Sequence, residues 1–168
     1  PETFAKFYNL DPVPVGDRTF TDFTYYDVLP HDLSFYRKFM TVDPAPTSDP
    51  TSCYSAINIT AADNEKNMYC LLSWKDRVAP DKLMDKIWEI YFHYKCEAVG
   101  IEAYVYQNSL KYWLQERIMN NKKNLFMKIV ELKHNGKTKE DHIAGLSPYV
   151  NTGRYKFQRK NTSLVYSL

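Results

Sequence analysis

The sequence predicts an α/β domain built on a mixed five-stranded sheet with helices on both faces. One observation is the spacing of apolar residues, which indicates strands and helices in the order βββαβαβα. A second is that three meander strands are followed by βα units, an order that gives a mixed sheet with helices on its faces. A third is length, because 168 residues suffice for one domain with its own core.

The first three expected strands are bounded by turn-forming residues. A short apolar run at 39–42 stops at Asp43-Pro44, and an alternating segment at 54–60 stops before Asp63-Asn64. The third strand is expected at 68–74. Consecutive strands joined in this way are typical of an antiparallel meander.

Helices and strands alternate in the second half. Pro80 opens the first helix, with Asp81 in its first turn, and apolar residues continue at helical spacing to Tyr94. A buried strand at 98–101 ends in Glu102. The remaining expected elements are a helix at 106–118, a strand at 125–132, a short helix at 139–146 and a segment at 155–157 that could form a last strand.

Residues 1–38 are interpreted as an irregular lead-in, and residues 39–168 as the domain. The lead-in is rich in Pro, Asp and Thr with scattered aromatic residues, a composition that favours loops. Such a start suggests one piece of a longer protein.

Composition excludes several classes of protein. No run of eighteen apolar residues is present, so no membrane-spanning helix and no membrane partner are expected. The aromatic content of 15% argues against disorder. The three cysteines are odd in number and far apart, which is typical of reduced, mostly buried thiols. The five glycines are dispersed, so the sequence has no phosphate-cradling loop.

Positive charge is concentrated near the end of the chain. The net charge is only +2, but residues 121–168 carry ten basic and three acidic side chains, a net charge of +7. A basic segment of this kind suggests a polyanionic partner. A solvated lysine-rich surface accounts for the same charge equally well.

Asp43 and Glu102 form the candidate site. Each ends an apolar strand, and ligands of open α/β sheets bind outside the carboxyl ends of the strands. If the two strands are parallel neighbours, the carboxylates stand side by side, and their repulsion favours a bound cation. Oxygen ligands suit Mg²⁺ or Mn²⁺. The alternative interpretation is that Asp43 caps a turn and Glu102 favours the start of the following helix.

Several motifs resemble the nuclease domain of large terminase subunits from tailed bacteriophages. The runs that carry the resemblance follow the family in order and spacing: Val42-Asp43-Pro44-Ala45, then 74–80, then a helix, then Val99-Gly100-Ile101-Glu102. Downstream, the family's pattern is similar to Lys139, Ile143, Leu146, Pro148 and 153–157. The lead-in also resembles the segment between the family's motor and its nuclease, so the resemblance covers nearly the whole chain.

The resemblance implies an RNase H-like fold and a metal-dependent endonuclease. Asp43 and Glu102 would be two of the metal-binding acids, with two Mg²⁺ or Mn²⁺ ions in the complete site. The family's third acid lies in an Asp-rich C-terminal helix, and the chain is expected to stop short of it. Asp141, the nearest remaining acid, and Asp49 are the candidate substitutes.

The resemblance also implies a function and partners. The expected activity is cutting of double-stranded viral DNA, with low sequence preference, during genome packaging in the cytoplasm of an infected bacterium. The expected partners are that DNA, an ATPase motor domain, the portal and the small terminase subunit. The candidate DNA-contacting residues are Arg77, Lys122, Lys123, Lys139 and Arg154. Two alternatives stay open: a resolvase or transposase-like enzyme of the same fold, and a DNA-binding or assembly module whose metal site has decayed.

Overall fold

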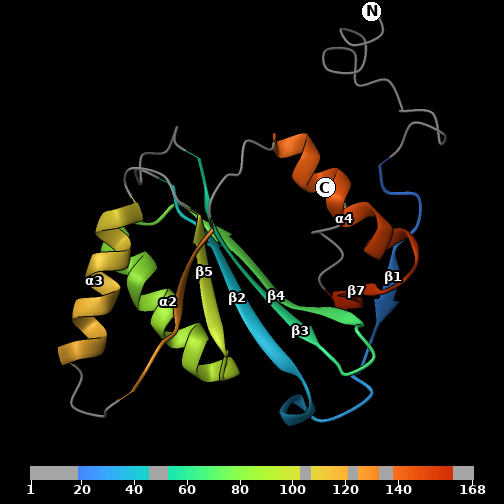
Figure 1. Cartoon of the computed structure of the whole chain (residues 1–168), viewed down its shortest axis with the longest axis horizontal. Helices are drawn as coiled ribbons and strands as arrows, with labels where there is room; N and C mark the ends of the chain where they lie inside the picture. Colours follow the sequence, from blue (N-terminus) through green and yellow to red (C-terminus); the bar gives the residue numbers. More distant parts are fainter. Residues whose placement is uncertain (1–18, 46–52, 103–106, 121–124, 133–137, 161–168) are drawn as a thin grey trace, which may run out of the picture.

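The computed structural model describes residues 19–45, 53–102, 107–120, 125–132 and 138–160 (Figure 1). Within these ranges the chain forms one seven-stranded sheet with the strand order β1-β7-β4-β3-β2-β5-β6. The strands are β1 (Thr24–Tyr26), β2 (Arg37–Asp43), β3 (Ser55–Ala62), β4 (Met68–Asp76), β5 (Ala98–Glu102), β6 (Ile129–Leu132) and β7 (Tyr155–Gln158). The helices are the short 3-10 turn η2 (Leu33–Phe35), α2 (Pro80–Tyr94), α3 (Gln107–Asn120) and α4 (Lys139–Asn151).

The antiparallel meander and the mixed sheet expected from the sequence are confirmed. β3 pairs antiparallel with both β2 and β4. The remaining pairs, β2 with β5, β5 with β6, β4 with β7 and β1 with β7, are all parallel. Among the described strands, β3 therefore runs against the other six, and the carboxyl ends of β2, β4 and β5 lie at one edge of the sheet.

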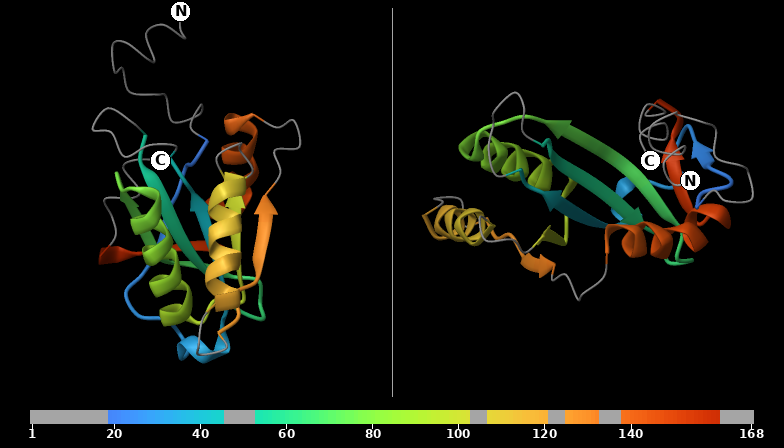
Figure 2. Two further views of the ribbon diagram at one scale, coloured as in Figure 1. Left: turned by 90° about the vertical axis from the view of Figure 1, so that its left-hand side faces the viewer. Right: turned by 90° about the horizontal axis from the view of Figure 1, so that it is seen from above.

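Helices cover both faces of the sheet, as expected. The main core lies between the sheet and the pair α2 and α3, where Met40, Ile59, Ile87 and Leu114 are at most 1% exposed. A second cluster lies on the other face, where Val150 of α4 packs with Cys70, Tyr155 and Phe157. Figure 2 shows α2 and α3 together on one side of the strands, with α4 apart from them.

The alternation of side chains along β4 joins these two cores. Tyr69 and Leu71 belong to the main core, whereas Cys70 between them belongs to the second cluster. Successive side chains of a strand point to opposite faces, so one strand contributes to both. This accounts for the continuous apolar run at the start of β4, which is typical of a strand buried on both sides.

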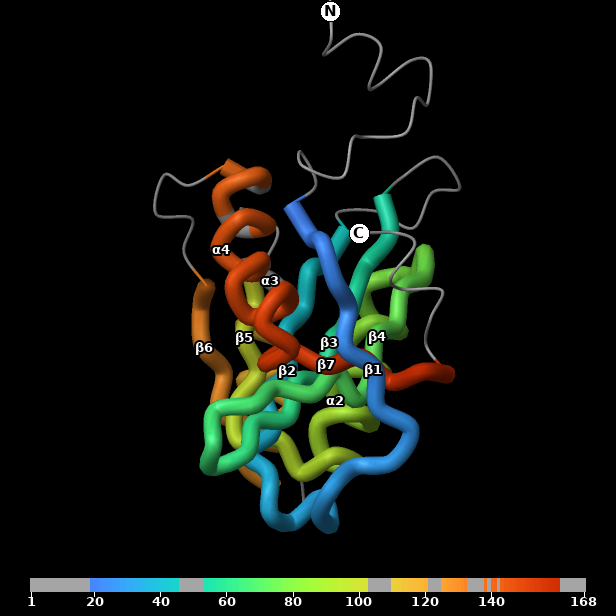
Figure 3. The backbone as a smooth tube through the Cα atoms, turned by 90° about the vertical axis from the view of Figure 1, so that its right-hand side faces the viewer, coloured from blue at the N-terminus to red at the C-terminus, as the bar shows by residue number. Residues whose placement is uncertain are grey.

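The sheet is larger than the sequence predicts, because β1 and β7 extend it beyond the five expected strands. β1 lies inside the segment interpreted as a lead-in, and it pairs with β7 (Figure 3). Tyr26 ties this edge to the domain, since its hydroxyl donates to the Cys70 carbonyl oxygen over 2.8 Å. The division of the chain into a lead-in at 1–38 and a domain at 39–168 stays a prediction. Residues 24–26, which lie inside the lead-in, form part of the domain's sheet.

Several boundaries and one side chain differ from expectation. β6 begins at Ile129 rather than 125, and α4 continues to Asn151 instead of ending at 146. The longer α4 follows from burial, because Val150 in its last turn is 1% exposed in the second core. β2 begins at Arg37 rather than 39, β3 covers Ser55–Ala62 rather than 54–60, and β4 continues to Asp76 rather than 74. α3 covers Gln107–Asn120 rather than 106–118. On α3, Trp113 is 56% exposed although its spacing predicts the buried face.

Candidate metal and nucleic-acid site

Asp43 and Glu102 lie next to each other at the carboxyl edge of the sheet. The last pair of the parallel strands β2 and β5 is Val42 with Ile101, and each carboxylate residue follows its member of that pair. Adjacent strands are about 4.8 Å apart, so the two Cα atoms are separated by roughly that distance. The condition that the sequence left open, parallel neighbouring strands, is met.

The two carboxylates also share one face of the sheet. Val42 and Ile101 point into the main core, where they are 2% and 3% exposed. Because side chains alternate along a strand, Asp43 and Glu102 point to the opposite face. Asp43 is exposed there and Glu102 is half-buried.

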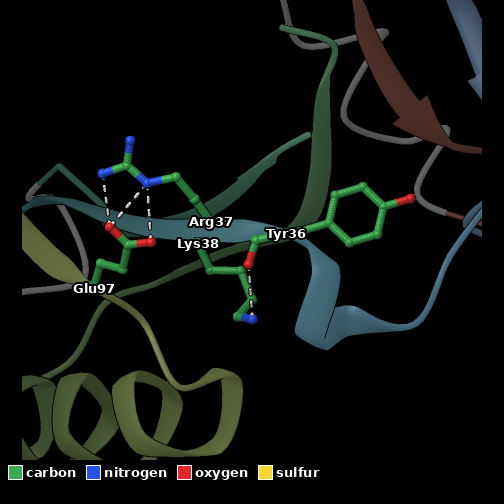
Figure 4. Close-up of polar contacts among 4 residues, drawn as sticks. All are labelled: Tyr36, Arg37, Lys38 and Glu97. Atoms are coloured by element: carbon green, nitrogen blue, oxygen red, sulfur yellow. Dashed lines mark hydrogen bonds and ion pairs between the residues drawn. The ribbon is translucent and has the colours of Figure 1, made fainter. Parts of the chain in front are cut away.

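An ion pair at the other end of the same strands supports this alignment. The Arg37 guanidinium donates to both carboxylate oxygens of Glu97, at 2.8–3.1 Å (Figure 4). Glu97 also donates its backbone N–H to the Lys38 carbonyl oxygen over 2.8 Å. The guanidinium holds the pKa of Glu97 below its ordinary value. An exposed pair adds little stability, but its forked geometry favours the register that brings Asp43 beside Glu102.

The chain after Asp43 is anchored by a buried hydroxyl. Ala45 donates its backbone N–H to Ser55 Oγ over 2.9 Å, and Ser55 is 0% exposed. Ser55 begins β3, whose next residue, Ala56, pairs with Asp43. The hydroxyl therefore fixes the path of the backbone immediately beyond the candidate metal ligand.

A row of side chains crosses the sheet at the level of the carboxylates. Asp43 pairs with Ala56 on β3, and Ala56 pairs with Lys75 on β4. Paired residues share a face, so Lys75 lies on the same face as Asp43, about 10 Å away across two strand spacings. The small Ala56 side chain separates them. Sequence reasoning missed Lys75, because only the strand order places it in this row.

Asp141 has a structural role at the start of α4. Its Oδ2 accepts hydrogen bonds from the backbone N–H and hydroxyl of Thr138, at 2.8 and 3.0 Å, and its own N–H donates to Thr138 Oγ1. This is a capping box. Figure 1 shows the first turn of α4 at the same end of the molecule as the carboxyl ends of β2 and β5. Whether Asp141 also binds metal stays a prediction.

The candidate DNA-contacting residues do not all come together. Arg77 directly follows β4 at the carboxyl edge, whereas Arg154 precedes β7 at the amino end of β4, where its carbonyl oxygen accepts from Met68. The nine residues of β4 separate these two arginines by roughly 30 Å at about 3.3 Å per residue. Three candidates lie outside the residues that the structure describes: the DNA-contacting candidates Lys122 and Lys123, and the metal candidate Asp49. Lys139 is described in its backbone but not in its side chain.

The donor set fits a hard divalent cation. Two neighbouring carboxylates repel unless a cation or a proton lies between them, and their oxygens are the ligands that Mg²⁺ and Mn²⁺ prefer. Among the described residues, no group of three His, Cys, Asp or Glu side chains lies close enough to hold a metal ion. Asp43 and Glu102 would supply two of the ligands of such an ion.

One hollow of the described surface, about 760 Å³, lies along residues 26–33 and is also lined by Phe35, Leu71, Tyr94 and Gln158. A site at the open edge of a sheet suits a long polymer better than a small molecule, which is bound in an enclosing pocket. No described helix is long and apolar enough to cross a membrane.

Comparison with solved structures shows the same fold in viral terminases. The chain is similar to the large terminase of a thermophilic bacteriophage in complex with ADP, with a TM-score of 0.61 and 11% identity over 86% of this chain and 34% of that one. For the large terminase nuclease of the thermophilic phage G20c, the TM-score is 0.54 and the identity 12%, over 83% of this chain and 70% of that one. For the Mn-soaked, inhibitor-bound terminase nuclease domain of human cytomegalovirus, the TM-score is 0.52 and the identity 11%, over 80% of this chain and 71% of that one.

These likenesses concern the fold. The chain covers 34% of the length of the ADP-bound terminase. No protein-family model matches the sequence, and no curated protein matches it. The mixed sheet, the helices on both faces and the structural neighbours agree with the resemblance seen in the sequence. The chain therefore has the RNase H-like α/β fold of large terminase nuclease domains.

Proposed function

We propose that the chain is a metal-dependent endonuclease domain that cuts double-stranded viral DNA during genome packaging. The observation that carries the proposal is that Asp43 and Glu102 follow paired residues of neighbouring parallel strands, on one face at the carboxyl edge of an RNase H-like sheet. This is where open α/β sheets bind ligands. The proposal includes work in the host cytoplasm beside an ATPase motor domain, the portal and the small terminase subunit.

Asp43 and Glu102 have the central chemical role. Their adjacent carboxylates hold divalent cations, Mg²⁺ or Mn²⁺, against the sheet edge. Bound ions of this kind activate water and offset the charge of a phosphodiester under attack, and two ions act together in the complete site. The buried Ser55 hydroxyl keeps the backbone beyond Asp43 in place, so the carboxylate is positioned before the substrate arrives.

Low sequence preference follows from the surroundings of the carboxylates. The described residues in the row of the carboxylates include a small alanine, Ala56, a lysine, Lys75, and Leu132, which pairs with Glu102. A lysine binds phosphate as a point charge, and phosphate contacts carry no direct sequence information. The enzyme would therefore recognise the DNA backbone rather than its bases.

The test is nicking of supercoiled plasmid by the wild type, Asp43→Asn and Glu102→Gln. The wild type is expected to nick with Mn²⁺ and more weakly with Mg²⁺, since Mg²⁺ demands a more complete ligand set. Both variants should fall to the level of a metal-free reaction. Asp27→Asn is the matched control, because Asp27 pairs with Arg159 on an exposed surface away from the site. Nicking retained by either active-site variant would reject the assignment, and an inactive wild type would favour the decayed module.

A further inference from the structure

Two cations lie over one tyrosine ring at the carboxyl edge. Arg77 Cζ is 4.1 Å from the centroid of the Tyr54 ring, and Lys75 Nζ is 5.6 Å from the same centroid. Both cations are exposed, and Tyr54 itself is 46% exposed. The three residues come from the facing ends of β3 and β4, where Ser55 pairs with Asp76.

This cluster lies on the same face as the carboxylates. Lys75 pairs with Ala56, which pairs with Asp43, and Arg77 follows Lys75 by two residues. The alternation of side chains along a strand places Lys75 and Arg77 together. Tyr54 likewise precedes Ala56 by two residues. The row that begins at Asp43 thus continues into the two cations.

The spacing matches a nucleic-acid strand. Lys75 lies about 10 Å from Asp43 across two strand spacings. One DNA strand advances about 3.4 Å along the helix axis per phosphate, so the cations stand about three nucleotides from the carboxylates. A duplex whose axis runs along this row, with one phosphodiester against Asp43, would bring a phosphate about three nucleotides away over this cluster.

The Tyr54 ring holds the Arg77 side chain in one position. An arginine side chain loses rotamer entropy when it is fixed in one position. A ring face that holds the guanidinium reduces that loss on binding, and it does so without neutralising the positive charge. Tyr54 is therefore a positioning residue for Arg77, with Lys75 as a second phosphate contact.

We propose that Tyr54, Lys75 and Arg77 form a backbone-phosphate contact that aligns the DNA strand across Asp43 and Glu102. The proposal rests on the proposed endonuclease function and adds to it the surface that places the strand. Arg77 and Lys75 make the phosphate contacts, and Tyr54 holds the guanidinium in position.

The test is binding of a fluorescent DNA duplex in EDTA, measured at several salt concentrations. The chain offers matched controls, because Arg159 lies over Tyr25 at 5.6 Å and Lys156 over Tyr69 at 5.1 Å, away from the carboxyl edge. Arg77→Ala and Lys75→Ala should each reduce the slope of log affinity against log salt by about 0.9. Arg159→Ala and Lys156→Ala should leave it unchanged. Thermal melting of each variant checks that it is folded.

The tyrosine variants separate a positioning role from a merely structural one. Tyr54→Phe keeps the ring and should bind as the wild type does. Tyr54→Ala should weaken binding in the wild-type background, and it should cause no further loss when it is added to Arg77→Ala. Equal binding by the cluster variants and their controls would overturn the proposal, and so would a wild type that does not bind DNA.

Binding and nicking together distinguish the two proposals. A wild type that nicks plasmid while the cluster variants bind normally would overturn this contact and leave the endonuclease standing. A wild type that never nicks while the cluster variants lose binding would reject the endonuclease and keep the contact.

Discussion

Replacing Ser55 with alanine should destabilise the domain and disturb the candidate site together. The hydroxyl accepts the Ala45 backbone N–H over 2.9 Å, and Ser55 and Ala45 are 0% and 8% exposed. Removing the acceptor leaves a buried donor without its partner, which costs about 1–3 kcal/mol. At about 2 kcal/mol, the melting temperature of a domain of this size falls by roughly 4–8 °C.

The assay combines thermal melting with plasmid nicking well below the melting temperature. Ser147→Ala is the control, since the Ser147 hydroxyl donates to the Ala144 carbonyl oxygen within its own helix. That change should shift melting little. Ser55→Ala should nick more slowly than both the wild type and the control even where all three are fully folded, because the backbone after Asp43 is less well fixed. Unchanged melting and unchanged nicking would refute the reasoning.

Two further predictions concern a turn and the cysteines. Burial alone would raise the pKa of Asp63, but hydrogen bonds, chiefly from Asn67, outweigh it and hold the pKa below 3.8. Asp63→Ala should therefore lower the free energy of unfolding, measured in urea at pH 7, by about 1 kcal/mol. The difference between wild type and variant should shrink as the pH falls below 3.8. A difference that does not change with pH would contradict these hydrogen bonds. In thiol labelling at pH 8, Cys53 is exposed and should react quickly. Burial raises the pKa of Cys70, and it raises the pKa of Cys96 to about 11. Both thiols should therefore react only when the protein unfolds. Rapid labelling of either one in the folded protein would contradict their burial.

Local patterns predicted the elements that carry the candidate site. Asp43 and Glu102 could be selected from sequence because each ends an apolar run, and the rule on carboxyl ends needs only that position. The helix that begins at Pro80 could also be predicted from the sequence, from the residues of its first turn and the helical spacing of its apolar residues. The adjacency of the two carboxylates was conditional, because it depends on which strands pair over long range.

The parts that could not be predicted depend on the sheet order. Lys75 and Tyr54 look like ordinary residues of a strand and a loop, and only the pairing of β2, β3 and β4 puts them in the row of Asp43. β1 has three residues in a segment rich in turn formers, so its pairing with β7 decides its conformation. The role of Asp141 did have a local signal, since Thr138 followed by an acid three residues later is a capping-box pattern.

The central claim is that Asp43 and Glu102 together hold a divalent cation. Anomalous diffraction from Mn²⁺-soaked crystals tests it most directly, because it locates the ion independently of any activity. The account predicts an anomalous peak within bonding distance of carboxylate oxygens of both residues, and its loss in Asp43→Asn crystals soaked in the same way. A wild-type crystal that shows no peak at this edge, or a peak unchanged in Asp43→Asn, would contradict the account.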